Sequence, residues 1–190
     1  MSQSKLLDPN FNNLTIHDES GLSTHAIIVD QDEKIVGEIK QVGHLRTHFL
    51  LLDSDGSKIG RSSKKVWSLG ATYEIRDSEN KLLGTVREKM HSLYHEIRMY
   101  DTNNKIILIS KHTGRDDCYE IADNNEKSIA LFRPKDDKRK KIDRFMRPFP
   151  PTNIFEIKDN SFDRKTLLCF FICLYNEIFG DYQNEPASGC

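Results

Sequence analysis

The residues best suited to binding chemistry form a basic stretch in the C-terminal third of the chain. Clustered cations attract anionic lipids, and aromatic side chains beside them can settle at a membrane interface. The same composition suits a nuclear localisation signal, or a solvated loop balanced by Asp136, Asp137 and Asp143. The stretch predicts an anionic-lipid site, with those two alternatives open. Its expected ligand-binding residues are six cations within ten positions and two aromatics: Lys138, Arg139, Lys140, Lys141, Arg144, Arg147, Phe145 and Phe149.

A second, smaller basic group lies earlier in the chain. Arg61, Lys64 and Lys65 are close in sequence to Trp67. We expect these three cations to form a secondary basic patch. Whether this patch joins the first one depends on how the chain folds.

Two patterns imitate metal sites. Asp53-Ser54-Asp55-Gly56 resembles the start of a calcium loop, but an EF-hand needs Gly at its sixth position and Glu at its twelfth, and here Gly is fourth and Lys64 is twelfth. Asp and Gly at these positions favour a hairpin turn. The pairs His44/His48 and His91/His95 have the spacing of helical zinc ligands. On a strand, residues four apart are separated by about 13 Å and cannot share an ion, so we expect no metal site.

Catalytic patterns are missing from the sequence. It contains no glycine-rich phosphate loop, no nucleophile elbow and no Cys-x-x-Cys pair. We therefore expect no catalytic residues, no cofactor and no enzymatic activity.

A repeated turn indicates the elements that must position the basic residues. Five times a β-rich run stops at Asp, crosses a few polar residues to Lys and resumes, and the Asp residues lie 22 to 24 positions apart. Asp, Asn and Gly suit such turns because they bond their own backbone or tolerate positive φ. The pattern predicts hairpins in series and hence one closed or nearly closed antiparallel barrel. The five segments are Asp30 to Lys34, Asp53 to Lys58, Asp77 to Lys81, Asp101 to Lys105 and Asp123 to Lys127.

A helix is expected after the hairpins, over about residues 164–179. The run from Thr166 to Tyr175 is apolar almost all round, so the helix must be buried. Asp163 or Ser161 can cap its start and Gly180 can end it. From Thr166 to Phe179 it measures about 21 Å, too short for a hydrocarbon core of about 30 Å. It can plug the barrel, or it can lie across one face of a sandwich.

Composition indicates a single soluble domain. The 190 residues carry a formal net charge of −1, so any lipid or nucleic-acid binding must come from a local patch, and we expect no specific nucleic-acid partner. Four cysteines, Cys118, Cys169, Cys173 and Cys190, form no disulfide framework. With no signal peptide in the sequence, we expect a cytoplasmic monomer, peripheral at membranes, with a nuclear location as the alternative. We expect flexible ends at 1–21 and 181–190 and a barrel domain at 22–180.

The order of these elements carries a family resemblance. Turns such as Arg76-Asp77-Ser78-Glu79-Asn80-Lys81 and Tyr100-Asp101-Thr102-Asn103-Asn104-Lys105, followed by one apolar C-terminal helix, resemble the tubby C-terminal-like superfamily, within it the LURP-one-related and phospholipid scramblase branches. The similarity covers roughly residues 22–179 and implies a twelve-stranded barrel around a central helix. Tubby domains bind phosphoinositides through basic residues, and scramblases are associated with calcium-dependent lipid movement. The stretch from Lys158 to Asp163, which matches the scramblase calcium segment, offers only two carboxylates.

Three functions follow from residues and resemblance together. The leading hypothesis is a non-enzymatic membrane-surface module that binds phosphoinositide-type headgroups through the basic stretch. The first alternative is a scramblase-like lipid transporter, whose helix would leave the barrel; Asn176 and Glu177 near the helix end weigh against insertion. The second alternative is an interaction or regulatory scaffold with no lipid ligand.

Overall fold

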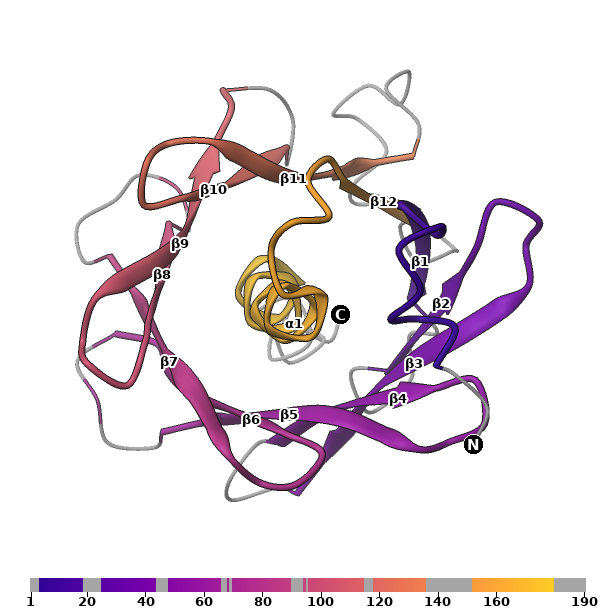
Figure 1. Ribbon diagram of the computed structural model, residues 1–190, viewed down its shortest axis with the longest axis horizontal. Coiled ribbons are helices and arrows are strands. Elements are labelled where there is room, and N and C mark those ends of the chain that lie inside the picture. The colour runs from indigo at the N-terminus through magenta and orange to yellow at the C-terminus, as the bar shows by residue number, and fades with distance from the viewer. Residues whose placement is uncertain are drawn as a thin grey trace, which may run out of the picture.

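A closed β-barrel surrounds a central helix (Figure 1). The computed structural model describes residues 4–18, 25–43, 48–65, 68, 70–89, 94, 96–114, 118–135 and 152–179. Each strand pairs with its sequence neighbours in antiparallel fashion and β1 pairs with β12, which confirms the predicted barrel and its twelve strands. The strands are β1 (Asn13–Asp18), β2 (His25–Val29), β3 (Ile35–Val42), β4 (His48–Asp53), β5 (Lys58–Lys64), β6 (Thr72–Asp77), β7 (Leu82–Glu88), β8 (Ile97–Tyr100), β9 (Ile106–His112), β10 (Tyr119–Asp123), β11 (Ser128–Pro134) and β12 (Thr152–Ile157), and the helix is α1 (Arg164–Phe179).

The five Asp-to-Lys segments form hairpin turns, as predicted. In four of them an Asp carboxylate oxygen accepts hydrogen bonds from the backbone N–H groups two and four residues further on. At Asp101 the donors are Asn103 and Lys105, both at 2.8 Å. The fourth residue of each turn has positive φ, for example 62° at Asn104 and 80° at Gly56. A register shift precedes each turn, so a repeated sequence produces a repeated local geometry.

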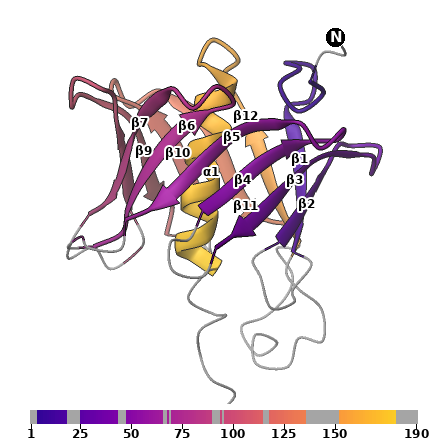
Figure 2. The ribbon, with the colours of Figure 1, turned by 90° about the horizontal axis from the view of Figure 1, so that it is seen from below.

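The alternating strand directions give the barrel two distinct ends (Figure 2). One end, here the turn end, carries the five aspartate turns and the start of α1. The other, the loop end, carries the C-terminus of α1 and the connections after β1, β3, β5, β7, β9 and β11. Any residue at the end of an odd-numbered strand therefore lies at the same end of the barrel as the last turn of α1.

Helix α1 is the core of the barrel. Every residue from Leu167 to Tyr175 is at most 1% exposed, so the helix is a plug and not a cover on one face of a sandwich. Cys169 and Cys173 are buried within this run. Among the described residues, no helix combines the length and the apolar character needed to cross a bilayer.

Two opposite walls of the barrel meet α1 in different ways. On β5, a Cβ added at Gly60 would collide with the Cys169 sulfur, so glycine lets the helix approach this wall closely. On the other side, Phe132 of β11 and Phe155 of β12 fill the wider space. Their ring centroids lie 5.3 and 4.3 Å from that of Phe171. Small residues on one wall and aromatic residues on the other fix the position of the helix inside the barrel.

Residues near the N-terminus hold the start of α1. Asp163 caps the helix, as predicted, because its carboxylate accepts a hydrogen bond from the Thr166 backbone N–H at 3.0 Å. The Arg164 guanidinium donates to the Leu6 carbonyl oxygen at 2.8 Å and to the Phe11 carbonyl oxygen. Residues 4–12 thus form a strap across the turn end that is bonded to the first residue of α1.

The barrel begins earlier in the chain than the sequence indicated. Composition placed its start at residue 22, but β1 closes the barrel against β12, and Leu6 before it is fully buried. The polar residues of this segment mask a strand period of two, in which Leu14 and Ile16 point into the core.

Candidate functional site at the loop end of the barrel

The predicted lipid-binding stretch is attached at the loop end. Its eight site residues, from Lys138 to Phe149, lie outside the described residues. The residues on either side of it are described: Lys135 follows β11, Thr152 starts β12, and the Lys135 backbone N–H donates to the Thr152 carbonyl oxygen at 2.9 Å. Lys135 also forms a 3.0 Å ion pair with Glu33, and this contact lowers the pKa of Glu33. Both attachment points of the basic stretch are therefore neighbours at one end of the barrel.

The secondary basic patch does not form as one surface. Side chains alternate along β5, so Arg61 faces outward while Lys64 faces the interior. Arg61 reaches toward the turn end and donates to the Asn80 side-chain oxygen at 2.8 Å. Lys65 forms a 3.1 Å ion pair with Glu74 on the outside. Only Lys64 and Lys65 lie at the loop end, and they reach carboxylates on different faces of the wall.

Lys64 belongs to a polar cluster inside the mouth of the barrel. Its ammonium lies 3.2 Å from Glu177 Oε1, and the same oxygen accepts hydrogen bonds from the Tyr73 hydroxyl and, at 3.4 Å, from the Asn176 amide. The Asn176 amide also donates to the Tyr73 oxygen at 2.5 Å. Three of the four residues are buried, and the Lys64 side chain is 40% exposed. We call Lys64, Tyr73, Asn176 and Glu177 the mouth cluster.

Electrostatics explains why the mouth cluster needs Lys64. Glu177 sits in the last turn of α1, where the helix dipole is negative, and no basic residue of that turn compensates it. Burial, together with the nearby charge of Glu177, raises the pKa of Tyr73 far above its ordinary value. Tyr73 therefore stays protonated and donates its hydrogen to Glu177. Lys64 supplies the only cation of the mouth cluster.

The thiols next to the mouth cluster are poor nucleophiles. Cys173 lies one helical turn before Glu177 and donates to the Cys169 carbonyl oxygen at 3.5 Å. Burial raises the pKa of Cys169 to about 12 and that of Cys173 well above its ordinary value. Neither thiol forms an appreciable thiolate near neutral pH.

The described residues of the two metal-like patterns form hydrogen bonds within a turn and between strands. Asp53 and Asp55 accept backbone N–H bonds from Ser54 and Ser57, at 2.9 and 2.8 Å, so these carboxylates shape a turn. His48 lies on β4 and its Nδ1 is 2.9 Å from the Ser63 hydroxyl oxygen. His44, His91 and His95 lie outside the described residues. Within the described residues, no three His, Cys, Asp or Glu side chains are grouped to hold a metal ion.

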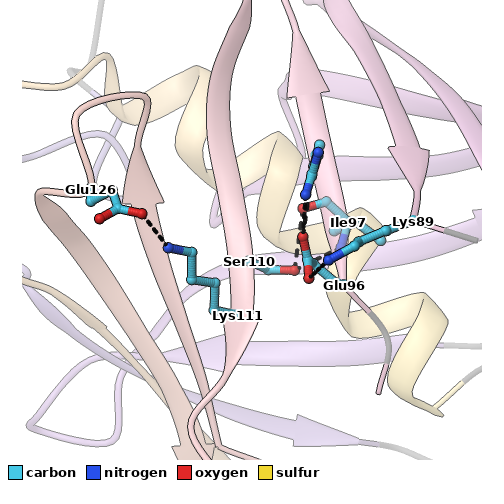
Figure 3. A network of polar contacts seen from close by, with 7 residues as sticks. Lys89, Glu96, Ile97, Ser110, Lys111 and Glu126 are labelled. Carbon is cyan, nitrogen blue, oxygen red and sulfur yellow. Dashed lines mark hydrogen bonds and ion pairs between the residues drawn. The ribbon is translucent and has the colours of Figure 1, made fainter. Parts of the chain in front are cut away.

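The outer wall near the loop end is an ion-pair network (Figure 3). The Glu96 carboxylate forms ion pairs with Lys89 at 3.0 Å and with Arg98 at 2.8 Å. Figure 3 also shows the neighbouring hydrogen bond from the Ile97 backbone N–H to the Ser110 hydroxyl oxygen. Partial burial raises the pKa of Glu96, but the bonds from Arg98 and Lys89 outweigh it and leave the pKa below its ordinary value. Glu96 remains ionised and pairs with Lys89, which follows β7 at the loop end.

Sequence reasoning did not identify the mouth cluster. The sequence shows Asn176 and Glu177 only as polar residues near the end of an apolar helix. Their partners Lys64 and Tyr73 precede Glu177 by 113 and 104 residues. Period-two alternation along β5 is the signal that could have separated Lys64 from Arg61 and Lys65.

Comparisons with known proteins support the architecture. No protein-family model and no curated protein matches the sequence. An X-ray structure of a protein from Arabidopsis thaliana has a TM-score of 0.59 and 11% identity to this chain, and the match covers 93% of this chain and 99% of that chain. At this identity the likeness shows the fold alone. This chain therefore has the twelve-stranded barrel that the family resemblance implied, while its place in the LURP-one-related or scramblase branch stays a prediction.

Proposed function

We propose that this protein is a non-enzymatic, cytoplasmic module that binds anionic phospholipid headgroups, of the phosphoinositide type, at the loop end of its barrel. The observation that supports this is the attachment of the basic stretch. Lys135 and Thr152 hold its two ends together at the loop end, the end of the barrel that also holds the last turn of α1. Lys64 and Lys65 lie at that same end.

The basic stretch supplies most of the positive charge for this function. Among the described residues, the lysines at the loop end are paired with carboxylates: Lys64 with Glu177, Lys65 with Glu74, Lys89 with Glu96 and Lys135 with Glu33. The stretch from 136 to 150 contains six cations and three carboxylates. Each cation near an anionic membrane contributes about 1 kcal/mol, so the net excess of three corresponds to about 3 kcal/mol, a weak and reversible attraction.

This role leaves α1 in the barrel. A headgroup bound at the loop end needs no exposure of the buried residues from Leu167 to Tyr175. A scramblase-like role would require that apolar run to leave its contacts with Phe132 and Phe155. The packing of α1 therefore favours binding at the membrane surface.

Vesicle binding tests the proposal. We expect co-sedimentation with phosphatidylcholine vesicles that contain phosphatidylinositol bisphosphate, weaker binding to phosphatidylserine vesicles, and none to phosphatidylcholine alone. Binding should weaken steeply as salt shortens the Debye length from about 10 Å toward about 3 Å. Changing Lys138, Arg139, Lys140 and Lys141 to Gln should cost roughly 1 kcal/mol per cation, which turns the net excess of three positive charges into a net charge of −1 and should reduce binding below detection.

The turn end offers a matched control. Changing Lys58, Lys81, Lys105 and Lys158 to Gln removes the same charge from the opposite end of the barrel, and we expect binding to change little. Equal losses of vesicle affinity in the two quadruple variants would show that binding depends on the net charge of the protein and not on a site at the loop end. An unchanged Kd for the loop-end variant would make the stretch a solvated connection and favour the interaction-scaffold function.

A further inference from the structure

The Lys64–Glu177 pair links the barrel surface to the buried helix. The Lys64 side chain is 40% exposed, whereas that of Glu177 is 7% exposed. One partner thus reaches solvent at the loop end while the other belongs to the last turn of α1. Whatever changes the pairing of Lys64 at the surface also changes the environment of Glu177 inside.

Each partner restrains the other. At 3.2 Å, the Glu177 carboxylate cancels much of the positive charge that Lys64 would present to an anion at the loop end. In return, Lys64 offsets a buried carboxylate at the negative end of a helix dipole. If Lys64 turns away, Glu177 keeps only its hydrogen bonds from Tyr73 and Asn176, with no cation beside it.

We propose that an anionic headgroup at the loop end competes with Glu177 for Lys64, and that this competition couples headgroup binding to the seating of the last turn of α1. The inference rests on the proposed function, because it needs an anion at the loop end. It adds a regulatory step: binding outside the barrel loosens residues 174–179 inside it.

Lys65 provides a matched comparison within the same strand end. It is adjacent in sequence, lies at the same end of the barrel and is paired at a similar distance, 3.1 Å, with Glu74. Its partner is on β6 and 33% exposed, so loss of that pair leaves no buried charge. Lys64 and Lys65 therefore contribute equal charge to an anion site but differ in their connection to α1.

Hydrogen exchange of the full-length protein tests the coupling. The probes are vesicles with phosphatidylinositol bisphosphate, phosphatidylcholine vesicles, and the soluble headgroup inositol trisphosphate. We expect the backbone amides of 174–179 to exchange about tenfold faster when either phosphoinositide probe is bound, with no change in the aspartate turns. The Lys65→Gln variant should show the same acceleration at saturating probe. In Lys64→Gln these amides should exchange fast already and respond no further.

The affinity of Glu177→Gln gives a second readout. This change frees the charge of Lys64, and one cation gained near an anionic surface corresponds to about fivefold tighter binding. Exchange in the parent protein needs no substitution, so the test survives if Glu177→Gln fails to fold.

The outcomes separate the coupling from the proposed function. Absence of binding to any phosphoinositide probe overturns both. Binding with unchanged exchange at 174–179, or with unchanged affinity in folded Glu177→Gln, overturns the coupling and leaves the proposed function standing. Acceleration by vesicles but not by bound inositol trisphosphate assigns the effect to the membrane surface and also overturns the competition for Lys64.

Discussion

The two ends of the barrel stabilise their charged residues by different routes. At the turn end, aspartates such as Asp77 and Asp101 bond backbone N–H groups two and four residues away. At the loop end, Glu177 depends on Lys64 and Tyr73, more than 100 residues earlier. A turn can form in an isolated hairpin, whereas the mouth cluster exists only after the barrel has closed around α1. The aspartate turns are thus stabilised locally, whereas the mouth cluster is sensitive to the position of the helix.

Helix α1 is held differently at these two ends. At the turn end, Arg164 bonds main-chain carbonyl groups of the strap, which cannot titrate or be replaced by another ligand. At the loop end, the helix is held by the side chain of Lys64, which another anion can attract. The difference makes the turn end the fixed end of the helix and the loop end the adjustable one.

The largest expected effect is at the fixed end. Changing Arg164 to Met removes donors to the Leu6 and Phe11 carbonyl oxygens and to Asn12, and leaves these acceptors partly buried without partners. With hydrogen bonds from a charged group contributing about 1.5–3 kcal/mol each, we expect the free energy of unfolding to fall by roughly 3–4 kcal/mol. Urea denaturation measures it. Lys165→Met is the control and should stay within about 0.5 kcal/mol of the parent. Similar losses in both variants would mean that the strap does not hold the helix.

At the adjustable end we expect a smaller loss. Lys64→Met leaves Glu177 buried without its cation, which costs about 3–5 kcal/mol for a fully buried pair. Because Lys64 is 40% exposed, we expect roughly 2 kcal/mol, and less than about 0.5 kcal/mol for Lys65→Met. Denaturant midpoints of the two variants give the comparison. Equal midpoints would show that the pair with Glu177 contributes no more than an ordinary surface ion pair.

How much the sequence predicts also differs between the ends. The aspartate turns are predictable because their information is local: Asp recurs at the start of each hairpin. Three positions later, Gly56, Asn80 and Asn104 are residue types that tolerate positive φ, and the other two turns place Glu33 and Glu126 in the same conformation. The plug is predictable because a helix that is apolar on all faces must be buried, and this helix is too short to span a membrane, so it must be buried inside the protein. Strand β1 was missed because polar residues conceal the alternation of Leu14 and Ile16.

The loop end was harder to predict because its contacts depend on closure of the barrel. Lys64 was expected to share a surface patch with Arg61, but alternation along β5 turns it inward to a partner on α1. Nothing near Lys64 in the sequence indicates Glu177. The basic stretch itself, from Lys138 to Arg147, stays a prediction outside the described residues.

A third prediction tests whether the aspartate turns act independently of the loop end. Asp101→Ala removes the acceptor for the Asn103 and Lys105 N–H groups, and we expect about 1 kcal/mol of destabilisation with no change in exchange at 174–179. Asp101→Asn keeps a side-chain oxygen in the same place and should recover most of the loss. If the Ala variant altered exchange at the loop end, the two ends would not be independent.

The smallest expected effect is a pH dependence at the turn end. Asp159, just before α1, accepts from Lys127 at 2.5 Å and from the Ser161 N–H at 2.9 Å, and these contacts lower its pKa to about 2. An unfolded Asp titrates near 3.9. A carboxyl group with a lowered pKa in the folded state stabilises the fold above the unfolded pKa and loses that contribution as the pH falls through the folded value. The contribution of Asp159 should therefore be complete above about pH 5 and disappear between about pH 4 and pH 2. Thermal unfolding of the parent and of Asp159→Asn at several pH values measures it: the melting temperatures should converge as the solution is acidified. A constant difference across this range would show that the Lys127 pair does not contribute to holding the fixed end.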